Sequence, residues 1–232
     1  MSSRSTSKNI VIFSGTIILG FILFILPNIF FGVFKINGGL SGINLAIVAI
    51  FQLIAIWLLI SFSLRSMHKN MEYIGLSFQH WQRDVLLGLF IALLRGVVVF
   101  GFVIPMTGGA ERPDIQEVIN ALDGTCVGLI SLMMLGVLGG GIAEEIYNRG
   151  FFITVMKDLF KSEKTGLWIA VPVSILFFSA GHMPTSTLLW IDILVASIIY
   201  TFLFLGTGRL TASMVSHASW NALAIVVVDY MY

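Results

Sequence analysis

Two adjacent carboxylates, Glu144 and Glu145, lie in an otherwise apolar stretch of the chain, and Arg149 follows four residues after the second. Residues four apart share a helix face, so Glu145 and Arg149 can form an ion pair along their own helix. Glu144 is rotated by roughly 100° from Glu145 and has no such partner. We therefore predict a supporting role for Glu145 and Arg149 and a reactive role for Glu144. The alternative is an ion-paired packing seam without chemistry.

His182 ends a later apolar stretch and is a candidate partner of Glu144. If the two stretches form an antiparallel hairpin with its turn near Glu163, Glu144 and His182 lie at the same depth, about 20–25 Å from the turn. This arrangement requires the helix that carries Arg149 to continue to about Phe160. A lone histidine at this position would otherwise be an interfacial or packed residue.

His217 and Asn221 are four residues apart near the end of the chain, so they share one helix face. Alone, such a pair could serve only for hydrogen bonding between helices. With Glu144 and His182, they make a set of one carboxylate, two imidazoles and one amide. These are the groups needed to activate a water molecule and to stabilise an oxyanion.

The composition indicates the elements that position these residues. Of 232 residues, 57% are hydrophobic and 11% are charged, and the mean hydropathy is +0.97. Soluble domains carry about 25% charged residues, so an ordinary globular enzyme is excluded. The net charge of +1 gives no indication of nucleic-acid binding. The single cysteine, Cys126, excludes an internal disulfide bond.

Seven stretches reach the length of about 20 apolar residues that a membrane span needs. They cover residues 10–31, 42–64, 85–104, 125–152, 167–181, 188–205 and 210–231. We therefore predict an all-α polytopic transmembrane helical bundle of seven spans. It forms one integral membrane domain, with a three-span region at 1–124 and a core at 125–232. The first span has no small-residue cleavage site after it, so we expect an uncleaved anchor.

The basic residues between the spans predict the orientation. Nine of them fall on one side of the predicted bundle and two on the other. The nine are Arg4, Lys8, Arg65, Lys69, Arg83, Lys157, Lys161, Lys164 and Arg209, and the two are Lys35 and Arg112. The positive-inside rule then places the N-terminus in the cytoplasm.

Arg95 lies inside the third span, about 15–18 Å deep and close to the depth of Glu144 and Glu145. A guanidinium there needs a carboxylate, carbonyl groups or water. The simpler expectation is a buried ion pair with the two glutamates or contacts with backbone carbonyls, since Asp192 lies near the outer end of its span and is a poorer partner. The alternative is that Arg95 binds an anionic substrate group such as a peptide carboxylate.

Three motifs on successive spans resemble those of the CPBP family, the CAAX proteases and bacteriocin-processing endopeptidases also called Abi proteins. They are Glu-Glu-x-x-x-Arg (Glu144 to Arg149), Phe-x-x-x-His (Phe178 to His182) and His-x-x-x-Asn (His217 to Asn221). The resemblance covers residues 125–232 and implies an intramembrane endopeptidase. It implies that Glu144 and His182 activate water, and that His217 and Asn221 polarise the scissile carbonyl and hold its oxyanion.

The resemblance leaves two mechanisms open. In one, Glu144 is a general base assisted by His182, and no cofactor is needed. In the other, Glu144, His182 and His217 bind zinc and leave a coordination position open. The chain has no His-Glu-x-x-His motif, and pairing of Glu145 with Arg149 would leave a zinc site without a base. We therefore favour the metal-free mechanism.

The resemblance also indicates which substrates and which alternative functions to expect. The expected substrate is a peptide or protein at the lipid bilayer, either a bacteriocin or pheromone precursor or a CAAX-like C-terminus. The compact chain favours the small peptide and a bacterial plasma membrane. A non-catalytic membrane regulator or bacteriocin-immunity protein of the same family is the alternative, and a transporter would also bury carboxylates and histidines.

Overall fold

The structure is a computed structural model that describes residues 3–231, without the side chains of residues 3–6 and 37. The side chain of Arg4, which contributes to the predicted orientation, thus lies outside the described part. Seven helices in the described range are long and apolar enough to cross a membrane, which confirms the predicted all-α bundle. They are Ser7–Phe34, Ile43–Ser66, Trp81–Met106, Cys126–Asp158, Glu163–Gly181, Thr187–Thr207 and Leu210–Met231.

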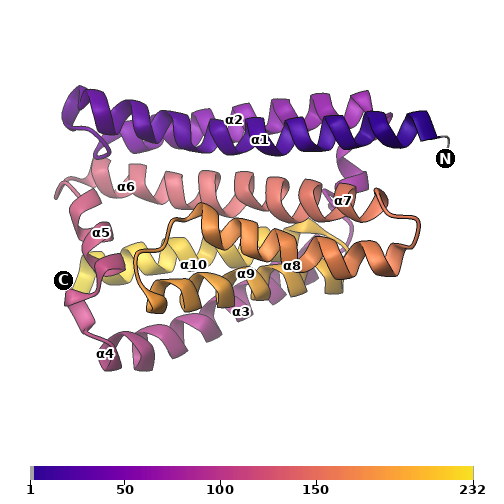
Figure 1. Ribbon diagram of the computed structural model, residues 1–232. Helices are drawn as coiled ribbons and strands as arrows, with labels where there is room; N and C mark the ends of the chain where they lie inside the picture. Colours follow the sequence, from indigo (N-terminus) through magenta and orange to yellow (C-terminus); the bar gives the residue numbers. More distant parts are fainter. Residues whose placement is uncertain (1–2, 232) are drawn as a thin grey trace.

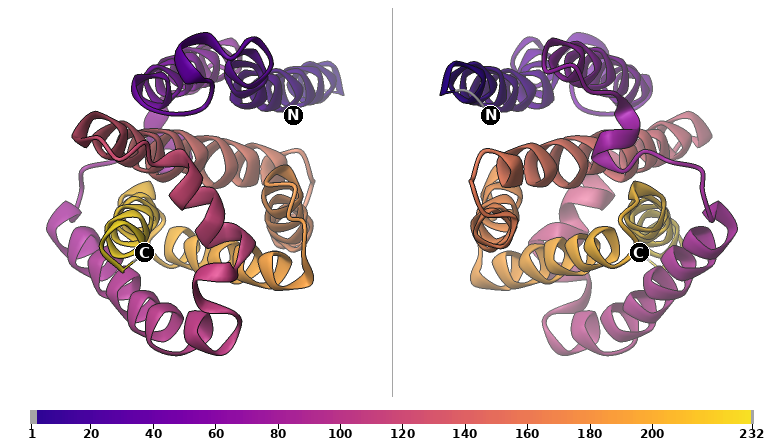
Figure 2. Two further views of the ribbon diagram at one scale, coloured as in Figure 1. Left: turned by 90° about the vertical axis from the view of Figure 1, so that its left-hand side faces the viewer. Right: turned by 90° about the vertical axis from the view of Figure 1, so that its right-hand side faces the viewer.

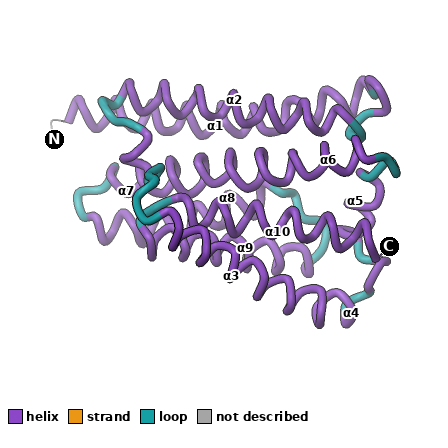
Figure 3. The backbone as a smooth tube through the Cα atoms, turned by 180° about the vertical axis from the view of Figure 1, so that it is seen from behind, coloured by secondary structure: helices purple, strands orange, loops and turns teal. Residues whose placement is uncertain are grey.

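The bundle is arranged around its fourth span. Helices α1 (Ser3–Phe34) and α2 (Ile43–Ser66) lie side by side on one side of it. Helices α3 (Trp81–Val98), α8 (Glu163–Gly181), α9 (Thr187–Thr207) and α10 (Leu210–Met231) lie on the other (Figures 1 and 2). The helices account for most of the backbone, and the connecting loops are short (Figure 3). Helix α3 packs mainly against α10, so the N-terminal and C-terminal halves share one bundle.

The fourth span is wound more loosely than a regular α-helix. It begins as α6 (Cys126–Met134), continues as π-helix over Leu135–Glu144 and Ile146–Ile153, and ends as α7 (Thr154–Asp158). The helix therefore continues past Arg149 almost to Phe160, as the predicted hairpin requires. π-Helical turns are rare and frequently mark functional sites. Here both π-helical segments adjoin the Glu144-Glu145 pair.

Glycines in the fourth span let α10 approach it closely. A Cβ atom on Gly141 would lie 2.5 Å from the Cβ of Ala218, and one on Gly140 would lie 2.6 Å from Nδ2 of Asn221. Small residues allow such close packing of helices within a membrane. The close approach brings the side chains of α10 against the backbone of the π-helical segment.

A cluster of buried apolar side chains joins the fourth span to α2 and to the turn that follows it. It includes Ile60 of α2, Ile74 of the 3₁₀ turn Met71–Ile74, and Ile146 and Phe151 of the fourth span, each essentially inaccessible. In lipid, tight van der Waals packing rather than apolar burial holds helices together. This cluster therefore fixes the fourth span against its neighbours.

A polar contact at the end of the bundle reinforces this packing. The hydroxyl of Tyr73, in the 3₁₀ turn, donates a hydrogen bond of 2.7 Å to the carboxylate of Asp158 at the end of α7. Partial burial, followed by this carboxylate, raises the pKa of the Tyr73 hydroxyl well above its usual range. Tyr73 therefore stays a neutral donor at ordinary pH.

The segment between the third and fourth spans holds a short amphipathic helix, α5 (Pro113–Ala121). Arg112 precedes it and donates two hydrogen bonds, of 2.9 and 2.7 Å, to the carboxylate of Asp114. This bidentate contact raises the pKa of Arg112 and fixes the start of the helix. Ile115 points into the bundle and is buried beside Ile104 and Val228, so α5 covers one end of the bundle.

Candidate active site

The hairpin of the fourth span and α8 places Glu144 opposite His182, as predicted. The carboxylate atom Oε2 of Glu144 lies 3.8 Å from Nε2 of His182. Among the described residues, this oxygen has no hydrogen-bond partner although it is buried. Glu144 and His182 line a cavity of about 70 Å³ together with aromatic side chains, among them Phe24 and Tyr147. An unpartnered buried carboxylate oxygen beside an imidazole is free to hold a reactant.

A backbone contact determines which nitrogen of His182 carries the proton. Its Nδ1 lies 2.9 Å from the carbonyl oxygen of Phe178, one turn earlier in α8. A carbonyl oxygen only accepts hydrogen bonds, so Nδ1 is the donor and Nε2 of the neutral ring presents a lone pair toward Glu144. The separation of 3.8 Å is too long for a direct hydrogen bond. One water molecule can bridge it by donating a proton to each partner.

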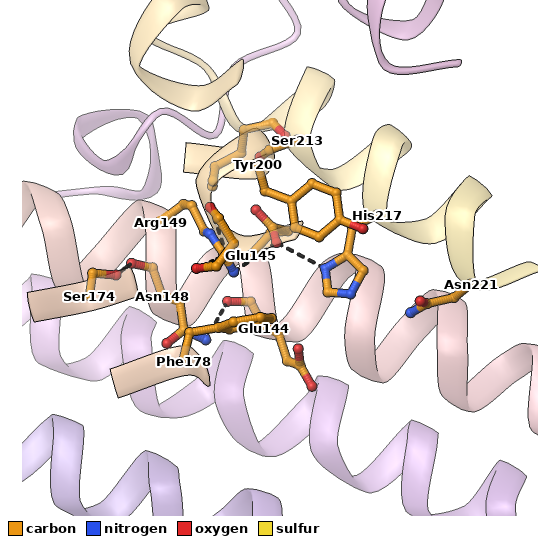
Figure 4. A network of polar contacts seen from close by, with 12 residues as sticks. Glu144, Glu145, Asn148, Arg149, Ser174, Phe178, Tyr200, Ser213, His217 and Asn221 are labelled. Atoms are coloured by element: carbon orange, nitrogen blue, oxygen red, sulfur yellow. Dashed lines mark hydrogen bonds and ion pairs between the residues drawn. The ribbon is translucent and has the colours of Figure 1, made fainter. Parts of the chain in front are cut away.

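Glu145 and Arg149 form the ion pair that their spacing predicts. Oε1 of Glu145 lies 3.0 Å from Nη1 of Arg149, and both side chains are fully buried. Arg149 also donates a 2.9 Å hydrogen bond to Oγ of Ser197, and its guanidinium lies 4.1 Å from the ring centroid of Phe178. Figure 4 shows the carboxylate of Glu144 pointing away from this pair. The adjacent carboxylates therefore have different surroundings.

Glu145 has a second partner that the sequence did not reveal. Its Oε1 lies 2.9 Å from Nδ1 of His217, which is itself buried (Figure 4). The carboxylate thus joins the fourth span to α10 and fixes the orientation of the imidazole. With Nδ1 held by Glu145, the atom left to act on a substrate is Nε2.

His217 and Asn221 face the same turn of the fourth span, as their spacing predicts (Figure 4). Nδ2 of Asn221 donates a 2.8 Å hydrogen bond to the carbonyl oxygen of Gly136. A Cβ atom on Gly140 would lie 2.6 Å from this nitrogen and 3.5 Å from Nε2 of His217. Both nitrogen atoms therefore approach the backbone one turn before Glu144. The amide group of Asn221 keeps a second N–H for another acceptor.

Tyr200 of α9 is a site residue that the sequence analysis missed. Its ring stacks on the imidazole of His217, with ring centroids 4.4 Å apart and planes inclined by 17°. Its hydroxyl accepts a 3.0 Å hydrogen bond from Nη1 of Arg95. A signal was present in the sequence, since Ser197, Tyr200 and Thr201 place polar groups three and four residues apart in an apolar span.

The expected partner of Arg95 was wrong. Its Nη2 lies 3.1 and 3.2 Å from the two carboxylate oxygens of Asp192, and it contacts neither Glu144 nor Glu145. Glu145 is already held by Arg149 and His217. The sequence estimate compared backbone depths only, whereas an arginine side chain is long enough to reach toward one end of its span.

The guanidinium of Arg95 also lies over an aromatic ring. This group lies 3.8 Å from the ring centroid of Trp220, a favourable cation–π contact. The side chain is buried, whereas that of Asp192 is 27% exposed. A substrate carboxylate would have to displace Asp192 to bind here, so binding of substrate by Arg95 stays a prediction.

The four predicted catalytic residues are not all brought into one of the cavities described for the site. Glu144 and His182 line the small cavity, whereas His182 and Asn221 line a neighbouring cavity of about 440 Å³. His217 lines neither of these two cavities. Residues of α5, Asp192 and Trp220 form further walls of the larger one. His182 is common to the walls of both cavities.

The donor set is only partly suited to a metal ion. Both imidazoles present Nε2 while Nδ1 contacts an oxygen, as metal-binding histidines usually do. However, among the described residues no three histidine, cysteine, aspartate or glutamate side chains are grouped closely enough to hold an ion. Glu144, His182 and His217 are thus not grouped as three ligands of one ion in this arrangement, and the metal-free mechanism stays a prediction.

Comparison with known proteins gives one match. Residues 126–223 match the family model described as type II CAAX prenyl endopeptidase Rce1-like. This range contains Glu144, Glu145, Arg149, His182, His217 and Asn221, so the resemblance found from the motifs is confirmed over it. No curated protein and no solved structure matches the chain. The match and the seven apolar helices identify an integral membrane protein and support a CAAX protease-type endopeptidase.

Proposed function

We propose that the protein hydrolyses a peptide bond of a membrane-associated substrate, using a water molecule activated by Glu144 and His182. The observation that carries this proposal is the 3.8 Å approach of Glu144 Oε2 to His182 Nε2, with the carboxylate oxygen lacking another partner among the described residues. A water between these atoms donates one proton to each. Its oxygen lone pairs then remain free to attack a carbonyl carbon.

In the proposed reaction, Glu144 is the general base. It takes a proton from the water as the water oxygen bonds to the scissile carbonyl carbon, and it later delivers that proton to the leaving amine nitrogen. The carbonyl of Phe178 holds His182 in the tautomer that accepts from the water. His182 thus orients the nucleophile, and no covalent enzyme intermediate forms.

His217 and Asn221 are proposed to stabilise the oxyanion. The second N–H of the Asn221 amide can donate to it, since the first is held by Gly136. Nε2 of His217 can donate as well when the ring is protonated. Glu145 stabilises that imidazolium through Nδ1. Glu145 and Arg149 therefore act as positioning residues.

The proposed mechanism needs no metal cofactor. Prolonged dialysis of the reconstituted protein against a chelator is therefore expected to leave the rate of peptide cleavage unchanged. Cleavage is measured before dialysis, after it, and after zinc is added back. Loss of activity that zinc restores would contradict the mechanism and would make Glu144, His182 and His217 ligands.

The larger cavity is proposed to receive the substrate chain. It adjoins His182 and Asn221, and most of its wall is apolar, with contributions from Phe100, Ile115 and Ile225. This environment suits apolar residues of a peptide next to the scissile bond. We propose a small peptide such as a bacteriocin or pheromone precursor, cut in a bacterial plasma membrane with the N-terminus of the enzyme in the cytoplasm. A CAAX-like C-terminus is the alternative substrate.

Mass spectrometry of membranes tests the proposed function and identifies the substrate. Cells that make the Glu144→Ala or His182→Ala variant are expected to accumulate uncut precursor peptides that disappear in cells making the wild type. His68→Ala is the matched control, because His68 is exposed in the loop after α2. If no peptide differs between wild type and the two site variants, the chain is instead a non-catalytic regulator.

A further inference from the structure

A second large cavity, lined by described residues, lies away from the candidate active site. Helices α3 and α9 both pack against α10, whereas their own backbones hardly approach each other and Arg95 of α3 links them through Tyr200 and Asp192. They leave a cavity of about 640 Å³ at the end of the bundle where α3 begins and α9 ends. Its walls come from the first half of α3 and the second half of α9.

The wall of this cavity is divided into an apolar and a polar part. Leu87 and Ile91 of α3 face Ile198 and Phe202 of α9 along the apolar part. The polar part lies at the helix ends. Such a division matches a ligand with a hydrocarbon chain and a polar head.

The polar part carries an unpaired positive charge. Asp84 and Arg209 neutralise each other through two hydrogen bonds of 2.6 and 2.8 Å. Arg83, beside them, has no hydrogen bond or ion pair with any described residue. His80 adds a further donor. The polar part of the cavity therefore favours binding of an anion.

Aromatic residues indicate the depth of the polar part in a bilayer. Phe78 and Trp81 precede Arg83, and their side chains are 85% and 51% exposed. Exposed aromatic side chains flanking a span are typical of the membrane–water interface. Arg83 then lies at the level of lipid headgroups, and the roughly 12 Å of α3 from Arg83 to Ile91 faces the acyl region.

We propose that this cavity binds an anionic glycerophospholipid, with its phosphate at Arg83 and one acyl chain between α3 and α9. A soluble anion would leave the apolar walls without a ligand, and a zwitterionic lipid would leave the charge of Arg83 uncompensated. The lipid fills the space between the first half of α3 and the second half of α9. This inference does not depend on the proposed peptidase activity.

Native mass spectrometry of the full chain in detergent tests the proposal. With phosphatidylglycerol and phosphatidylcholine added in equal amounts, the wild type is expected to retain phosphatidylglycerol preferentially. Arg83→Gln is expected to lower its retention about fivefold, the effect of one basic residue at a headgroup. Inorganic phosphate in excess should not displace the lipid; complete displacement would identify a phosphate site and overturn the proposal.

Two further variants control for charge and for shape. Arg65→Gln removes an exposed basic residue at the same end of the bundle and should leave lipid retention unchanged. Ile198→Trp fills the apolar part without changing the charge and should lower retention as Arg83→Gln does. Equal retention of the two lipids by the wild type, or an equal loss in Arg65→Gln and Arg83→Gln, would show only general attraction of anionic lipid.

Discussion

Replacing Glu144 by Gln is expected to lower the rate of peptide cleavage by a factor of about 10²–10⁴, the usual contribution of a general base. Gln keeps the size of the side chain but cannot accept the proton of the attacking water. The fold should persist, because among the described residues the carboxylate of Glu144 forms no ion pair except its long contact with His182. Cleavage of a precursor peptide in liposomes and thermal unfolding in detergent measure the two quantities.

The matched control is Glu72→Gln in the 3₁₀ turn Met71–Ile74, which removes an exposed carboxylate that lines neither cavity of the candidate site. It is expected to cleave at the wild-type rate. Glu144→Asp should fall between wild type and Glu144→Gln, because it keeps the base but withdraws it from the water. A fully active Glu144→Gln protein would refute the assignment of this residue as the base.

The second large effect concerns stability. Glu145→Gln should destabilise the protein by about 3–5 kcal/mol, because it leaves the buried charge of Arg149 without its counterion. It also removes the carboxylate that orients His217. Thermal unfolding in detergent and recovery of folded protein from membranes measure the loss.

A double substitution tests whether the uncompensated charge of Arg149 causes the loss of stability in Glu145→Gln. Glu145→Gln combined with Arg149→Met removes both charges, so it is expected to be more stable than Glu145→Gln alone. Stability of the double variant at or below that of the single variant would show that ion pairing is not the cause. A stable but inactive Glu145→Gln protein, together with an active Glu144→Gln protein, would reverse the roles assigned to the two carboxylates.

The features predicted correctly from the sequence depend on short separations along the chain. Long apolar runs gave the seven spans, because each must satisfy its own backbone hydrogen bonds within lipid. The ion pair of Glu145 with Arg149 follows from residue spacing within one helix. The approach of Glu144 to His182 follows from two helices joined by a short turn, where the connection fixes the register.

The features that sequence reasoning missed join helices that are distant in the chain. The contacts of Glu145 with His217 and of Arg95 with Asp192 link residues 72 and 97 positions apart. Such contacts depend on the angle at which two helices cross and on the rotation of each helix about its own axis. Both quantities depend on how the side chains of several helices pack together. The π-helical winding of the fourth span was hidden as well, because periodicity analysis assumes regular α-helical turns.

The amino-acid sequence is therefore sufficient to predict a seven-span helical membrane protein, with its candidate chemistry on the fourth, fifth and seventh spans. The packing of distant helices adds what each of the two adjacent glutamates meets outside its own helix, His217 for Glu145 and His182 for Glu144. Glu145 is held from two sides by Arg149 and His217, whereas Glu144 faces His182 across a gap that one water can bridge. Adjacent residues of a helix point about 100° apart. Their chemical difference thus arises from Arg149 on the same helix and from the neighbouring helices that each one meets.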